Sequence, residues 1–139
     1  METIKALEVR KIVKDLWPKV GFMWLTPHED KFSMPSMAEL EQFLAISKVD
    51  KERFTDGVKD CVFFSLILHA EAKVYYVNNT DLKYPIAIGE VFATKFNGWS
   101  MKHNANISIV ENKVYLIEPQ SDEIHKGSSD MDEILIVRM

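Results

Sequence analysis

The stretch from residue 62 to residue 77 constrains this chain most, because it is apolar almost all round the helix that it would form. A helix with that pattern is normally buried inside a protein. The stretch falls short of the roughly 20 apolar residues that a membrane-spanning helix needs. We therefore predict a central buried helix. Residues 55–60 are typical of a loop, which places Cys61 in the first turn of that helix.

Helical patterns precede this stretch and alternating patterns follow it. Ser36 and Glu39 form a capping-box pattern, which predicts that a helix begins there. Before the central helix we also expect a helix at 3–16, a short strand or extended segment at 20–25 and a loop at 26–34. After it we expect strands at 85–94, 103–110, 114–118 and 133–138, with a polar loop at 121–132. Helices first and antiparallel strands second predict an α+β fold.

Length and composition limit the function classes. The chain has 139 residues, which suits one domain covering 1–139. Its formal net charge of −4 gives no electrostatic footprint for nucleic acid. A charged amphipathic N-terminus argues against a signal peptide, and no segment predicts a membrane span. The single cysteine cannot form an internal disulfide, which favours a reducing compartment, the cytoplasm.

Cys61 and His103 are the pair of residues best suited to chemistry. Unpaired N–H groups and the dipole at a helix start favour the thiolate, the reactive form of cysteine. His103 opens an alternating strand, and several cysteine hydrolases place their imidazole on a strand in this way. His69 lies on the same helix, roughly 12 Å from Cys61 along the axis, and His28 and His125 lie in expected loops. A lone cysteine in an apolar helix is also typical of a core residue.

An imidazole that serves a thiol needs a polar group to orient it, and three residues are candidates: Glu118, Gln120 and Asp122. A two-residue hairpin loop at 112–113 would set Asp122 opposite His103. Because side chains alternate along strands, all three candidates share the face of His103. Strict pairing favours Gln120 or Asp122, whereas a bulge or a wider loop would bring Glu118 closer.

Three short motifs occur in a recognisable order: Asp60-Cys61, His103-Asn104-Ala105-Asn106 and Glu118-Pro119-Gln120. With the segment 115–124, they closely resemble small phage and bacterial proteins related to the peptidase domain that follows the lectin domain in a mushroom agglutinin. The resemblance covers about residues 33–138. It identifies the chain as similar to the papain-like cysteine peptidases.

This resemblance implies a papain-like fold, with N-terminal helices and a central buried helix packed on an antiparallel sheet. It implies a Cys-His-Glu triad in which Cys61 is the nucleophile, His103 the general base and acid, and Glu118 the orienting carboxylate. The expected function is a cysteine hydrolase acting on a peptide or protein substrate, in the host cytoplasm if the chain is phage-encoded. Two alternatives remain: a catalytically inactive scaffold acting as a phage or bacterial interaction protein, and an acyl transferase of the transglutaminase type.

The chain departs from the family pattern at two places. The family commonly has acidic residues just after the cysteine, linked in the agglutinin to calcium, whereas this chain has Val62 and Phe63. Calcium needs oxygen ligands, so we expect no metal and no cofactor. Papain-like enzymes also supply a side-chain oxyanion donor before the cysteine, and here only Thr55, Lys59 or backbone N–H groups are available. The acidic residues Asp130, Asp132 and Glu133 could hold a cation, although an acidic loop is more often simply solvated.

Overall fold

The computed structural model describes residues 1–25 and 30–139. Its helices are α1 (Ala6–Leu16), α2 (Met37–Ile46) and α3 (Cys61–Asn79), with a short 3-10 turn, η1, at Val49–Lys51. Its strands are β1 (Glu2–Lys5), β2 (Phe22–Trp24), β3 (Lys31–Met34), β4 (Ile88–Phe96), β5 (Trp99–Val110), β6 (Lys113–Glu118), β7 (Glu123–Lys126) and β8 (Glu133–Arg138).

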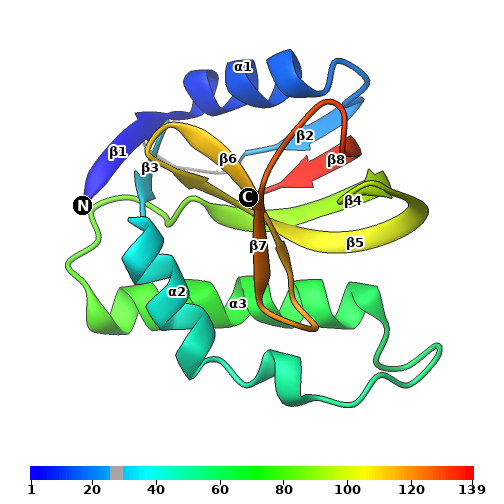
Figure 1. Ribbon diagram of the computed structural model, residues 1–139. Coiled ribbons are helices and arrows are strands. Elements are labelled where there is room, and N and C mark those ends of the chain that lie inside the picture. The colour runs from blue at the N-terminus through cyan, green and yellow to red at the C-terminus, as the bar shows by residue number, and fades with distance from the viewer. Residues whose placement is uncertain (26–29) are drawn as a thin grey trace.

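Six strands form the main sheet in the order β2-β8-β4-β5-β6-β7, and β1 pairs with β3 in a small second sheet. In the main sheet β2 runs parallel to β8, and the other pairs are antiparallel. Figure 1 shows α1 on one side of the sheet and both α2 and α3 on the other. The molecule is therefore a sheet covered by helices on both faces.

The alternation of side chains along β5 divides the core into two halves. Ala105, Ile107 and Ile109 face α1 and pack in one buried cluster with Val9 and Val13 of that helix. The opposite face meets α3, where a second cluster contains, among other residues, Leu68, Ala72 and Val110. Consecutive residues of β5 thus point to opposite sides of the sheet, which decides where the motif residues of this strand lie.

The helix α3 corrects the expectation of a helix buried on all sides. One face packs on β4 and β5, but the outward face leaves Val62, Leu66, Val74 and Val77 exposed. The apolar pattern predicted the helix correctly and its burial wrongly. The helix belongs to the outer layer of the molecule, so only the side toward the sheet is covered.

The predicted fold class is also corrected. The chain begins with a strand, β1, and the sheet is mixed, because β2 lies parallel to β8 at the edge. A hydrogen bond from Gly21 N to Leu135 O holds that edge strand in place. The segment expected as a loop at 26–34 contains β3 at its end, whereas residues 26–29, including His28, lie outside the described residues. The polar loop at 121–132 contains β7, so His125 lies on a strand.

Two local predictions are confirmed. Ser36 caps α2, accepting from Glu39 N, while the Glu39 carboxylate accepts from Ser36 N at 2.7 Å. The helix α3 begins at Cys61, and Asp60 is its N-cap residue. Both of these helices, α2 and α3, lie on the same side of the sheet, below it in Figure 1.

The hairpin between β5 and β6 turns one residue earlier than expected. Val110 pairs with Lys113, so the two loop residues are Glu111 and Asn112, with φ values of 51° and 59°. Positive φ at both positions fits the two-residue turns that match strand twist. The pairing of Ile107 moves from Glu118 to Leu116. The shift is by two residues, so each side chain keeps its face of the sheet.

Candidate functional site

The thiol of Cys61 lies at the start of α3 and is half-buried. The Asp60 carboxylate accepts hydrogen bonds from Val62 N at 3.1 Å and from Phe63 N at 3.2 Å. These are two of the N–H groups that a helix start leaves without partners. The helix dipole favours an anion here, but the Asp60 carboxylate already takes much of that advantage and adds a negative charge beside the sulfur.

Two asparagines of the His103–Asn106 motif connect β5 to α3. Asn104 Nδ2 approaches Cys61 Sγ at 3.7 Å. Asn106 is fully buried, and its Nδ2 donates to Ser65 O at 2.8 Å and to Gly89 O at 3.0 Å. Both asparagines point toward α3 because they are two residues apart on one strand. Asn106 thus fixes α3 to β4 about one helical turn beyond the thiol.

His103 points to the other side of the sheet and pairs with Glu118. The distance from His103 Nε2 to Glu118 Oε2 is 2.6 Å, and His103 is only 5% exposed. The other oxygen of Glu118 accepts from Gln120 N at 3.1 Å. The side of the imidazole meets the ring of Phe96, with centroids 5.0 Å apart. A buried imidazole held by a carboxylate has a fixed orientation, as an acid–base group requires.

The hairpin register explains why Glu118 is the partner of His103. Asn106 pairs with Ile117, so the same register sets Glu118 opposite Ala105 and diagonal to His103 on the same face. Next to His103 the register between β4 and β5 shifts, and such bulges redirect side chains. Gln120 offers its backbone N–H to Glu118, and Asp122 lies in the turn beyond β6 near Asp50.

The structure brings two of the three predicted site residues together, His103 and Glu118, and leaves Cys61 bonded to a residue that was not predicted, Asn104. Among the described residues, the hydrogen bond to the Cys61 thiol comes from Asn104, and the imidazole of His103 bonds Glu118. The direct hydrogen bond expected between Cys61 and His103 does not occur in this part of the chain. The two pairs are linked because His103 and Asn104 are consecutive residues of β5. The catalytic roles assigned to these residues remain predictions.

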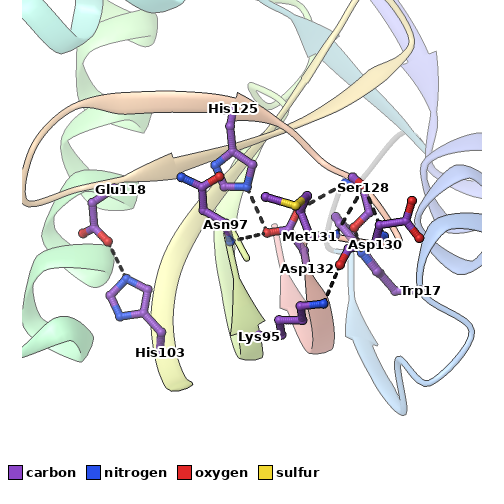
Figure 2. A network of polar contacts seen from close by, with 10 residues as sticks. All are labelled: Trp17, Lys95, Asn97, His103, Glu118, His125, Ser128, Asp130, Met131 and Asp132. Carbon is purple, nitrogen blue, oxygen red and sulfur yellow. Dashed lines mark hydrogen bonds and ion pairs between the residues drawn. The ribbon is translucent and has the colours of Figure 1, made fainter. Parts of the chain in front are cut away.

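A second imidazole–carboxylate pair, which sequence reasoning missed, lies close to the first. Figure 2 shows His125 directed toward the carboxylate of Asp132, beside Asn97 and Ser128. His125 Nε2 lies 2.9 Å from Asp132 Oδ1, which also accepts from Asn97 N at 2.9 Å. Asp132 Oδ2 accepts from Ser128 N at 3.1 Å. Asp132 is therefore a hydrogen-bond acceptor for three segments, and within the described residues no group of acidic, histidine or cysteine side chains is arranged to hold a metal ion.

A third cluster joins α3 to the sheet at His69. Its Nδ1 lies 3.1 Å from Glu90 Oε2, and Arg138 Nε donates to the same oxygen at 2.8 Å. Burial opposes the ionisation of Glu90, but the hydrogen bonds from His69 and Arg138 outweigh it and hold the pKa of that carboxyl below its usual value. Within residues 1–25 and 30–139 the hydrogen bond to Cys61 comes from Asn104 and not from this cluster, which agrees with the helical distance that excluded His69.

Comparisons with known proteins identify the fold alone. No protein-family model matches the chain, and no curated protein matches it. Among solved structures, one described as a PSL1a–E64 complex matches with a TM-score of 0.83 and 12% identity, over 99% of this chain and 50% of that one. A Polyporus squamosus lectin bound to the human-type influenza-binding epitope Neu5Aca2-6Galb1-4GlcNAc matches with a TM-score of 0.78 and 14% identity, over 99% and 49%. The chain spans about half the length of these neighbours.

These comparisons correct the family assignment. The neighbour that is described by a protein name is a lectin, and no peptidase family model matches. The lectin neighbour contradicts the papain-like fold and a hydrolase, cysteine-peptidase or thiol-protease function, together with the alternatives of an inactive papain-like scaffold and a transglutaminase-type acyl transferase. A peptide or protein substrate gains no support. Residues of the short motifs make structural contacts that need no peptidase function. Asn106 joins α3 to β4 by hydrogen bonds, and Glu118 bonds both His103 and the backbone N–H of Gln120.

No helix in the described part of the chain combines the length and the apolar composition that a crossing of the bilayer would need.

Proposed function

We propose that Cys61, His103 and Glu118 form a reactive-thiol site for a small ligand. One observation carries the proposal: a buried imidazole is fixed by a carboxylate at 2.6 Å, and the next residue of the same strand bonds the only thiol of the chain. Buried acid–base groups close to a nucleophile are characteristic of functional sites. In this proposal Cys61 is the nucleophile, His103 takes the thiol proton, and Glu118 orients the imidazole.

The chemistry can be written with iodoacetamide as a probe. The Cys61 sulfur forms a bond to the methylene carbon, the carbon–iodine bond breaks, and iodide leaves with its electron pair. In this proposal the thiol proton passes to His103 around the end of the sheet where β5 begins, and the Glu118 carboxylate stabilises the imidazolium. The thiol sulfur accepts a hydrogen bond from Asn104 Nδ2. Hydrogen bonds of such sites often tighten only when a ligand binds.

The neighbour described as a complex with E64 motivates a second probe. We expect E64 to bind this chain at Cys61 and to increase the intact mass by one molecule. Because Cys61 is the only cysteine, Cys61→Ser removes every thiol and supplies a clean background. The reducing cytoplasm stays the proposed compartment, since it keeps a lone thiol free.

The test compares alkylation rates of folded and urea-unfolded protein by mass spectrometry. We expect the folded thiol to react faster than the unfolded one, and His103→Asn and Glu118→Gln to slow the reaction by roughly tenfold or more. His69→Gln is the matched control, because it breaks another buried histidine–carboxylate pair that has no contact with Cys61. Equal rates in the folded and unfolded chains, or no response to His103→Asn, would contradict the proposal.

Carbohydrate binding is a second candidate, which the lectin neighbour with its bound trisaccharide favours. The most exposed aromatic residue is Trp99, which is 72% exposed at the turn between β4 and β5. Met101 and Met131 are exposed as well, and Met131 O accepts a hydrogen bond from Gly98 N in the same turn. A tryptophan with an apolar face and an N–H suits a ring that carries hydroxyl groups.

Calorimetric titration with the same trisaccharide tests this candidate. Binding that Trp99→Ala abolishes and Trp24→Ala preserves would support a sugar site at the turn. Trp24 is the matched control because it is also exposed, on the edge strand β2. An absence of binding heat at millimolar sugar would exclude the trisaccharide as a ligand of this half-length chain.

A further inference from the structure

Phe96 lies between two imidazoles, and each imidazole is held by its own carboxylate. Its ring centroid is 5.0 Å from that of His103 and 4.9 Å from that of His125, with interplanar angles of 64° and 80°. Glu118 holds the first imidazole and Asp132 the second. Edge-to-face contacts of this kind are favourable arrangements for aromatic rings. The two pairs are therefore in contact through one buried ring.

Asp132 also fixes the backbone beside Phe96. Its carboxylate is fully buried, and the Oδ1 atom that bonds His125 also accepts from the backbone N–H of Asn97, the residue directly after Phe96. Figure 2 shows His125 of β7 and Asn97 of the turn after β4 both directed at Asp132. Phe96 is thus held in two ways: the next residue, Asn97, is bonded to Asp132, and the Phe96 ring packs against His125. The other imidazole that the Phe96 ring contacts is that of His103.

We propose that His125 and Asp132 are positioning residues for His103, acting through Phe96. They hold the Phe96 ring against the imidazole, which keeps the imidazole on Glu118. This inference rests on the proposed function in one respect, namely that His103 takes the proton of the Cys61 thiol. The precision of a buried site depends on the packing that supports it, so loosening this support should weaken the site without touching it.

Three substitutions at His125 separate the two contacts. His125→Phe keeps a ring against Phe96 and loses the hydrogen bond to Asp132, which retains the Asn97 N–H. His125→Gln keeps a donor and loses the ring. His125→Ala removes both. Lys95→Met is the matched control, because it breaks only the bond from Lys95 to Asp130 O in the neighbouring loop.

The principal readout is the NMR signal of the His103 ring protons, which the ring current of Phe96 shifts. We expect His125→Ala to move these signals and to slow Cys61 alkylation by roughly tenfold. His125→Phe should restore most of both, His125→Gln should not, and Lys95→Met should change neither. If His125→Ala does not fold, the phenylalanine and glutamine variants decide the question by the same contrast.

The two proposals can fail separately. If the wild-type thiol is unreactive but the His103 signals follow the ring at position 125, the positioning role stands and the reactive-thiol site fails. If the thiol is reactive and the His103 signals ignore every substitution at position 125, the positioning role is overturned. Equal effects of His125→Phe and His125→Gln would also overturn it, because a ring contact predicts a difference.

Discussion

Asn106 offers the sharpest test of how β5 supports the start of α3. Its amide group donates to a carbonyl of the helix, Ser65 O, and to a carbonyl of β4, Gly89 O. The whole residue is buried, so no part of it contacts solvent. Asn106→Ala removes both hydrogen bonds and leaves a small void between the helix and the sheet. The helix would then lose its polar tie near Cys61.

The expected loss can be worked from these contacts. Two buried hydrogen bonds contribute about 1 kcal/mol each. The removed amide leaves roughly 25 Å³, which at about 24 cal/mol per Å³ adds roughly 0.6 kcal/mol. Asn106 Oδ1 has no hydrogen-bond partner among the residues that the structure describes, so its removal relieves part of the cost. We expect Asn106→Ala to lower the free energy of unfolding by about 2 kcal/mol.

Urea denaturation measures the loss, and Cys61 alkylation at low urea measures the effect on the site. Ser108→Ala is the matched control: Ser108 is buried on the same strand face, but its hydroxyl donates to Ala87 O and not to the helix. We expect that variant to lose about 1 kcal/mol with no change in the alkylation rate. A loss below about 0.5 kcal/mol for Asn106→Ala, or an equal effect on alkylation in both variants, would refute the reasoning.

Three further predictions concern α3 and the sheet around it. Asp60→Ala should cost about 1 kcal/mol by removing the helix cap, whereas Asp60→Asn keeps the cap, removes a negative charge beside the thiol and should speed Cys61 alkylation. Burial, and next the charge of Asp50, raise the pKa of Asp122 to about 6. The charged form therefore destabilises the fold progressively from about pH 4 to pH 6, so Asp122→Asn should add up to about 1 kcal/mol in urea denaturation at pH 7 and nothing at pH 3.5, after allowance for solvent screening. Gly89→Ala would put a Cβ atom 2.1 Å from Arg138 O and should lower the melting temperature sharply, whereas Gly21→Ala, with its nearest atom at 4.0 Å, should leave it nearly unchanged.

Local signals in the sequence predicted local structure. Ser36 and Glu39 marked the start of α2, and the loop before Cys61 marked the start of α3. Pairings between distant segments carried no such signal. The edge strand β2 lies beside β8, more than a hundred residues away, and three residues of alternating character do not specify a partner. The exposure of the outer apolar face of α3 could not be predicted for the same reason. Hydropathy identifies an apolar face but does not indicate whether another element covers it.

The hairpin loop shows how a one-residue error altered the prediction of the site. The predicted loop was Asn112-Lys113, but the turn uses Glu111 and Asn112. The true register brings Glu118 nearer to His103 by two positions. Strict pairing in the expected register therefore favoured the wrong candidates, Gln120 and Asp122, although it placed all three on the correct face.

The alternation of β5 also limits where a ligand could reach the whole site. His103 points to the α1 side of the sheet, with Glu118, whereas Asn104 points to the α3 side, with Cys61. No ligand can touch both side chains through the middle of a sheet. A molecule that engages the thiol and the imidazole together must therefore lie at the end of the sheet where β5 begins, next to the exposed residues before His103. At that end the register between β4 and β5 shifts, which interrupts the regular ladder.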